Sequence, residues 1–208
     1  MRYYGPPCGR LVRTHMTLEG PFGCMTTPAQ GNRIPPRAPW AADNGRFGKG
    51  WPGHDAYVRW LARLQPIADR CAFVLAPDIP FDMPGTLEFS SPYLALIRGM
   101  GFPVALALQN GAEVMALPWD EFDVAFIAGD DGWKRGPAGY EAIGQAAGRG
   151  KPVHMGRVNG AGMLAYAIGT GCSSADGTTF TYGPDTNAGD MLRWLGELER
   201  TGAQGVLL

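Results

Sequence analysis

The sequence lacks the features that define several large protein classes. It has no apolar run near the roughly 20 residues that a membrane-spanning helix needs, and its first ten residues, MRYYGPPCGR, lack the apolar core of a secretion signal. Its formal net charge is −1, and only three of its 18 basic residues are lysines. A broadly basic nucleic-acid coat protein is therefore excluded, although a local basic patch is not. We expect a soluble, cytoplasmic protein with no membrane partner.

Cysteine is scarce and scattered, which argues against a zinc knuckle. The four cysteines are Cys8, Cys24, Cys71 and Cys172, and no two of them form a CxxC pair. The sequence also contains no HExxH motif, no GxxxxGK[ST] loop and no GxGxxG fingerprint. We therefore expect buried, reduced thiols, no metal site and no cofactor.

Short apolar segments separated by helical patterns are what the sequence does contain. Such strands, apolar on both faces, are typical of a parallel sheet with helices around it. The length favours one domain over residues 1–208. The pattern predicts strands at 39–42, 71–76, 103–108, 123–128, 153–156 and 173–175, a short one at 23–27, and one or two more within an otherwise irregular first forty residues. It predicts helices at 53–68, 86–100 with a break or a start at Pro92, 136–149, 161–168 and 190–201.

Polar residues and glycine cluster where these predicted strands end. They are Asp43, Asp78, Gln109, Gly129, Arg157 and Asp176. A closed barrel brings such ends together on one rim, whereas an open sheet spreads them along a crevice. This convergence favours an α/β fold with a barrel-type site. For any single strand-end aspartate, a helix cap or a turn residue is the alternative interpretation.

Two carboxylates on one rim can serve as nucleophile and acid/base in retaining glycosyl transfer. Asp43 and Asp176 are far apart in the sequence, so only the fold can bring them together. His154 lies inside an apolar strand, which is typical of a core histidine. Lys134 follows a strand end beside Trp133, where it could contact a phosphate or simply lie in a surface loop.

Seven segments, in order, resemble the tRNA-guanine transglycosylase superfamily. They are GCMTTPAQGN (23–32), WAADNGRFG (40–48), FVLAPDIPFD (73–82), VALALQNG (104–111), FIAGDDGWKRG (126–136), HMGRVNG (154–160) and GCSSADGT (171–178). The chain is most similar to the phage-type deazapurine DNA transglycosylases, which exchange guanine in DNA for a 7-deazaguanine. For a phage-encoded enzyme of this kind, the compartment would be the host cytoplasm.

The resemblance implies a compact TIM-type (β/α) barrel, with its degree of closure left open, and a role for each matching residue. Asp176 matches the nucleophile that takes C1′ of the sugar, and Asp43 matches the aspartate that handles the proton. Asp78, Gln109 and the backbone of Gly129 match the groups that line the base pocket.

Contacts with the nucleic acid are expected from three further residues. These are Lys134 in the segment at 126–136, and Arg157 and Asn159 in the segment at 154–160. The expected partners are DNA and a free 7-deazaguanine base. The sequence carries no signal for an oligomeric state.

The sequence departs from the tRNA enzymes in two ways that favour DNA over tRNA: it has no CxCxxC…His zinc motif, and it is much shorter than those enzymes. In addition, Pro80 stands where the bacterial tRNA enzymes place a cysteine, so the exact base preference is left open. Three alternatives remain open: exchange on tRNA, an N-glycosidase that uses water as acceptor, and a base-binding module without catalysis.

Overall fold

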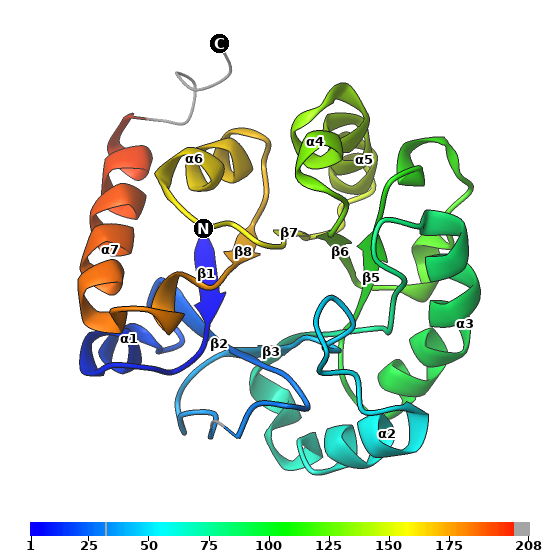
Figure 1. The fold of residues 1–208 in the computed structure, drawn as a ribbon, viewed down its shortest axis with the longest axis horizontal. Coiled ribbons are helices and arrows are strands. Elements are labelled where there is room, and N and C mark those ends of the chain that lie inside the picture. The colour runs from blue at the N-terminus through cyan, green and yellow to red at the C-terminus, as the bar shows by residue number, and fades with distance from the viewer. Residues whose placement is uncertain (32, 202–208) are drawn as a thin grey trace.

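Eight parallel strands form a closed barrel, in the order in which they occur in the chain (Figure 1). The computed structural model describes residues 1–31 and 33–201. The strands are β1 (Arg2–Gly5), β2 (Phe22–Thr26), β3 (Trp40–Ala42), β4 (Cys71–Leu75), β5 (Val104–Leu108), β6 (Val124–Ile127), β7 (Val153–Met155) and β8 (Ser174–Asp176). Pairing of β1 with β8 closes the ring, so the expected TIM-type barrel is confirmed and is complete.

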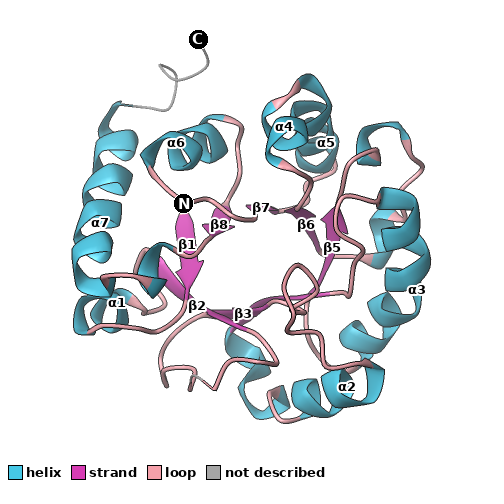
Figure 2. Cartoon of the chain, viewed as in Figure 1, coloured by secondary structure: helices cyan, strands magenta, loops and turns pink. Residues whose placement is uncertain are grey.

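Helices surround the strands on the outside of the ring (Figure 2). They are α1 (Arg10–His15), α2 (His54–Ala62), α3 (Met83–Gly99), α4 (Asp131–Arg135), α5 (Pro137–Gly148), α6 (Ala161–Gly169) and α7 (Pro184–Thr201). Short 3₁₀ turns lie at Gln65–Arg70, Ala112–Val114, Trp119–Glu121 and Thr179–Thr181. None of the described helices has the length and apolar content that a membrane crossing requires.

The strand period divides the core into two parts. In β5, Val104, Leu106 and Leu108 point outward into the cluster beneath the helices, while Ala105 and Ala107 belong to the cluster inside the barrel. This alternation is the two-residue repeat of a strand, and both faces are apolar because both are covered. Most strand residues are therefore buried, and the partly exposed ones lie at or near the strand ends.

Four side chains fill the interior close to the carboxyl ends. The rings of Tyr4, Phe73 and Phe126 each lie within 6 Å of the imidazole of His154, between ring centroids. These residues come from β1, β4, β6 and β7. We call this layer the floor, because it lies inside the barrel directly beneath the residues at the strand ends.

The N-terminal region contains the short strand predicted at 23–27, which is β2, and a further strand of the kind expected there, β1. Two of its strands, β1 and β2, complete the barrel, and helix α1 lies between them. The first of these strands carries the adjacent tyrosines Tyr3 and Tyr4, one in each core cluster. Its four residues are too few to show a sequence period.

The predicted helices are wrong at several boundaries. Pro92 lies inside α3 on an exposed turn, where the carbonyl that loses its partner can bond to water. The helix expected over 53–68 ends at Ala62, and a 3₁₀ turn containing Pro66 follows. Helix α7 begins at Pro184, six residues early, because its polar first turns carry no apolar period. Helix α4 was not expected at all.

The core assignment predicts unequal effects of the same truncation at two leucines. Leu106 is fully buried between β5 and the helices, whereas Leu18 is 56% exposed. We expect Leu106→Ala to lower the free energy of unfolding by about 2–5 kcal/mol, because it leaves a cavity, and Leu18→Ala by less than about 1 kcal/mol. Urea denaturation measures both. Equal losses at the two positions would contradict the assignment of Leu106 to the core.

Candidate functional site

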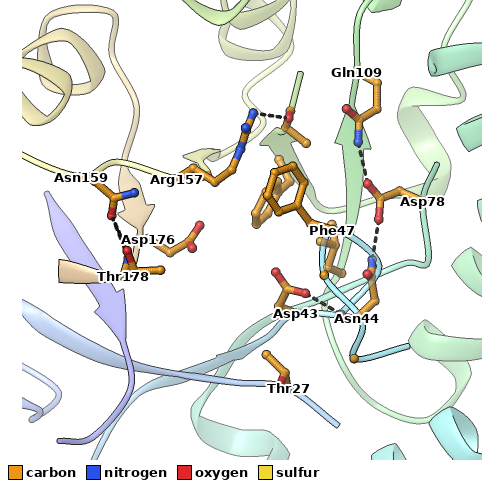
Figure 3. A pocket seen from close by; sticks show the side chains of 18 residues that line it. Thr27, Asp43, Asn44, Phe47, Asp78, Gln109, Arg157, Asn159, Asp176 and Thr178 are labelled. Carbon is orange, nitrogen blue, oxygen red and sulfur yellow. Dashed lines mark hydrogen bonds between the residues drawn. The ribbon is translucent and has the colours of Figure 1, made fainter. Parts of the chain in front are cut away.

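A cavity of about 310 Å³ opens at the carboxyl ends of the strands. This volume lies within the usual range for small-molecule sites. Loops that follow seven of the strands, β2 to β8, contribute to its wall. Nine polar side chains share this wall, and Figure 3 shows them around the opening: Thr27, Asp43, Asn44, Asp78, Gln109, Arg157, Asn159, Asp176 and Thr178.

Asp78 is held by two amide side chains. Its Oδ1 accepts a hydrogen bond from Asn44 Nδ2 at 2.8 Å and its Oδ2 accepts one from Gln109 Nε2 at 2.5 Å. Burial raises the pKa of Asp78, and the two amide donors act against that rise. The side chain is 6% exposed and still borders the cavity. The carboxylate is therefore a fixed acceptor at the cavity wall.

Gln109 is fixed at both ends of its amide. Its Oε1 accepts from the backbone N–H of Phe81 at 3.0 Å, while its Nε2 donates to Asp78. A primary amide carries two N–H groups, so one donor of Nε2 remains for a ligand. Gln109 can thus position Asp78 and contact a bound molecule at the same time.

Asp43 has a different environment from Asp78. Its Oδ1 accepts a hydrogen bond from Gly45 N–H at 2.6 Å, and Gly45 has a φ of 79°, which favours glycine. Burial raises the pKa of Asp43 to about 7, and the negative charges of Asp176 and Asp78 also raise it. A carboxyl group with this pKa can both give and take a proton near neutral pH.

Asp176 ends β8, on the far side of the barrel from Asp78 at the end of β4. Its side chain is 16% exposed and borders the cavity. The Oδ1 atom lies 3.0 Å from Nε2 of His154, and no donor among the described residues lies within hydrogen-bond distance of Oδ2. Figure 3 shows Asp176 and Asp43 both facing the opening. The fold therefore brings together the two carboxylates that the sequence separates by more than 130 positions.

Gly129, one of the predicted site residues, is hydrogen-bonded to other parts of the protein and does not border the cavity. The N–H of Gly129 donates to Leu108 O at 3.3 Å, its carbonyl accepts from Arg157, and the adjacent Ala128 borders the cavity in its place. A side chain at Gly129 would collide with the Trp133 ring. Both backbone polar groups of Gly129 are therefore hydrogen-bonded within the protein, and the absence of a side chain lets the Trp133 ring pack against it.

Lys134 is fully buried, so it differs from the surface phosphate contact that the sequence suggests. Its ammonium group donates to Gly156 O at 2.9 Å and lies 3.2 Å from Asp131 Oδ1. Burial lowers its pKa, and the nearby Arg157 charge lowers it further. The ammonium group fastens α4 to the loop after β7 and does not reach the cavity.

Arg157 and Asn159 do border the cavity, as expected of possible nucleic-acid contacts. The Arg157 guanidinium donates to Ala128 O at 3.0 Å and lies 4.6 Å from the ring centroid of Phe47. Asn159 Oδ1 accepts from the backbone N–H of Thr178 at 2.7 Å. Both residues thus brace the loops around Asp176 and present their remaining surface to the opening.

Sequence reasoning missed several residues of the cavity wall, among them Phe47. It also did not connect His154, which is buried as expected of a core histidine, with Asp176. Phe47 is 58% exposed at the cavity wall, an unusual position for a large apolar ring. His154 lies in β7 opposite Ser174 of β8, so its side chain shares a face with the residue two positions further on, Asp176. The strand register would have revealed this pair, but register is not readable from an isolated apolar run.

No group of three or more His, Cys, Asp or Glu side chains within residues 1–31 and 33–201 is arranged to hold a metal ion. All four cysteines are free thiols. The side chains at the cavity wall are mainly carboxylates, amides and aromatic rings.

The raised pKa of Asp43 predicts a pH-dependent stability. Because the folded protein holds this proton up to about pH 7 and the unfolded chain releases it near 3.8, folding is favoured below that range and loses this contribution as the pH rises. Asp43→Asn keeps an acceptor for Gly45 N–H but has no carboxyl group to titrate. We expect the free energy of unfolding of this variant, taken relative to that of the wild type, to be about 1–3 kcal/mol higher at pH 8 than at pH 5. Urea denaturation of both proteins at the two pH values measures it, and a constant difference would contradict the assignment.

No protein-family model matches the chain, and no curated protein is significantly similar to it. A functional proposal therefore depends on the chemistry of the cavity and on the resemblance of the seven segments.

Proposed function

We propose that the protein is a transglycosylase that replaces guanine in DNA with a 7-deazaguanine derivative, through a covalent bond between an aspartate and C1′ of the sugar. The resemblance of the seven segments suggests this reaction, and the cavity supplies the groups that it needs. The observation that carries the proposal is the arrangement of three carboxylates, Asp43, Asp78 and Asp176, around one opening in three different environments.

Asp78 and Gln109 suit the recognition of a guanine-like base. The Watson–Crick edge of guanine carries N1–H and an exocyclic amine, two parallel donors that a carboxylate can accept. Asp78 is held in place by Asn44 and Gln109, so it meets such an edge without losing much side-chain freedom. The free donor of Gln109 Nε2 can bond to O6.

Asp176 is the proposed nucleophile. Its carboxylate attacks C1′ of the deoxyguanosine, the bond from C1′ to N9 breaks, and the electron pair leaves with the base. Protonated Asp43 supplies a proton to the departing guanine. The products of this half-reaction are free guanine and an ester between Asp176 and the sugar.

The second half-reaction reverses the roles with a new base. The Asp43 carboxylate takes the proton from N9 of the incoming deazaguanine, N9 attacks C1′, and the ester bond to Asp176 breaks. Two displacements at C1′ give overall retention. The pKa of about 7 suits Asp43 to both proton transfers.

A base inside a duplex cannot reach this cavity, so the target nucleotide must be extruded or single-stranded. Extrusion costs roughly a few kcal/mol, which stacking on a protein ring can offset. Phe47 offers such a ring at the cavity wall, in edge contact with Phe81 and beneath Arg157.

The exchange reaction is tested directly by incubating the protein with guanine-containing DNA and a panel of 7-deazaguanine bases. After digestion to nucleosides, mass spectrometry should detect the deazaguanine nucleoside in the DNA. Asp176→Asn, which keeps the size of the side chain but not its charge, should lower the exchange rate by at least about 10³-fold. Asp185→Asn, a change in an exposed carboxylate of α7 outside the cavity, serves as the matched control with unchanged exchange.

Each alternative outcome has its own signature. Incorporation into tRNA and not into DNA would replace the proposed substrate. Release of free guanine without incorporation would indicate an N-glycosidase. Base binding without release, and without an effect of Asp176→Asn, would indicate a binding module. No exchange with any base of the panel would count against the proposal as a whole.

The exposed ring of Phe47 leads to a separate prediction about binding. Phe47→Ala should raise KM for DNA about tenfold and leave the free energy of unfolding nearly unchanged, since stacking of one base is worth about 1–3 kcal/mol and the ring is mostly outside the core. Steady-state kinetics measures it. Tyr140→Ala on α5, a ring 55% exposed away from the cavity, is the control. An equal effect of the two changes would refute the stacking role.

A further inference from the structure

His154 is a buried polar group for which the proposed reaction has no direct use. Its side chain is fully enclosed in the floor beneath the cavity, so it cannot touch a substrate. It nevertheless makes two side-chain hydrogen bonds, both to β8. The Nδ1 atom lies 2.9 Å from Ser174 Oγ and the Nε2 atom lies 3.0 Å from Asp176 Oδ1.

We propose that His154 is a positioning residue, which holds Oδ1 of Asp176 and so directs Oδ2 towards the sugar in the cavity. This inference rests on the proposed function for its catalytic meaning. The hydrogen bond from Nε2 of His154 to Asp176 does not depend on the proposed function.

The surroundings of the imidazole fix its orientation. The ring centroids of Phe126 and Phe73 lie 4.7 and 4.8 Å from it, and that of Tyr4 lies 5.9 Å away. These rings leave the imidazole no room to turn, because a close-packed interior permits few rotamers. The hydrogen bond to Asp176 is therefore rigid on the histidine side.

The hydrogen bonds also define which nitrogen carries the proton. A carboxylate oxygen only accepts, so Nε2 must be the donor to Asp176 Oδ1. The Ser174 hydroxyl can then donate to Nδ1. The Asp176 carboxylate in this way selects the Nε2–H tautomer, and the Ser174 hydroxyl completes the pairing at Nδ1.

The arrangement matters because a nucleophile must approach C1′ along a narrow direction. A carboxylate held at one oxygen keeps the other aligned, whereas a free carboxylate rotates about its side-chain bond. A misplacement of about 1 Å can cost about 100-fold in rate. The remaining oxygen of Asp176 has no donor within the described part of the chain, so it is free for the attack.

Two variants of His154 separate positioning from packing. His154→Phe keeps an aromatic ring among Tyr4, Phe73 and Phe126 but has no donor. His154→Gln places an amide N–H near the position of Nε2. Single-turnover assays with guanine-containing DNA should show adduct formation slowed about 10- to 100-fold in the Phe variant and largely recovered in the Gln variant. The dissociation constant for a 7-deazaguanine base should change less than about twofold in both, since the base site is formed by other residues.

A measurement on the unmodified protein covers the case in which the Phe variant does not fold. Long-range ¹H–¹⁵N spectra of histidine-labelled protein report which ring nitrogen carries the proton, and the spectrum of His154→Gln assigns the signal. We expect a proton on Nε2. A ring protonated on Nδ1 alone would overturn the inference.

The outcomes for the inference and for the proposed function differ. If the wild type forms no adduct while Nε2 carries the proton, the proposed function fails and the hydrogen bond stands. If the wild type forms the adduct and His154→Phe forms it at the same rate, the function stands and the positioning role fails. Equal slowing by Phe and Gln would also refute positioning, because it would show that ring packing alone matters.

Discussion

Closure of the barrel between β1 and β8 is the constraint on which the site depends. The register pairs Tyr4 of β1 with Asp176 of β8, which fixes the height of Asp176 relative to the rim. In an open sheet, β8 would be an edge strand far from β4, and Asp176 could not share a cavity with Asp78. The short strand β1, which has only four residues, thus determines whether the carboxylates meet.

The three carboxylates of the cavity differ in the partners that their burial requires. A buried charge needs donors, and each aspartate finds a different kind of donor. Asp78 has two amide donors, Asp176 has the imidazole of His154, and Asp43 has the backbone N–H of Gly45. Different environments give similar groups different chemical roles, which is how paired carboxylates divide acid/base work from nucleophilic attack. The pKa of Asp43, about 7, fits the acid/base part of that division.

The sequence predicted the parts of this structure that depend on local pattern. Apolar runs revealed six of the strands, and the polar residues after them placed Asp43, Asp78, Gln109 and Asp176 at one rim. What it could not predict depends on contacts between distant segments. The register that joins His154 to Asp176 is one case, and the burial of Lys134 beneath the loop after β7 is another. Both residues are polar in the sequence, and only packing shows that neither of them faces the cavity.

The proposed reaction requires a covalent bond between Asp176 and the sugar, and peptide mapping of a trapped adduct detects that bond directly. The protein would be incubated with guanine-containing DNA without a second base, denatured rapidly, digested with nuclease and protease, and analysed by tandem mass spectrometry. We expect a sugar-linked mass on the peptide that contains Asp176 in the wild type, and no such mass in Asp176→Asn. An adduct on Asp43 or Asp78 instead, with Asp176 unmodified, would contradict it.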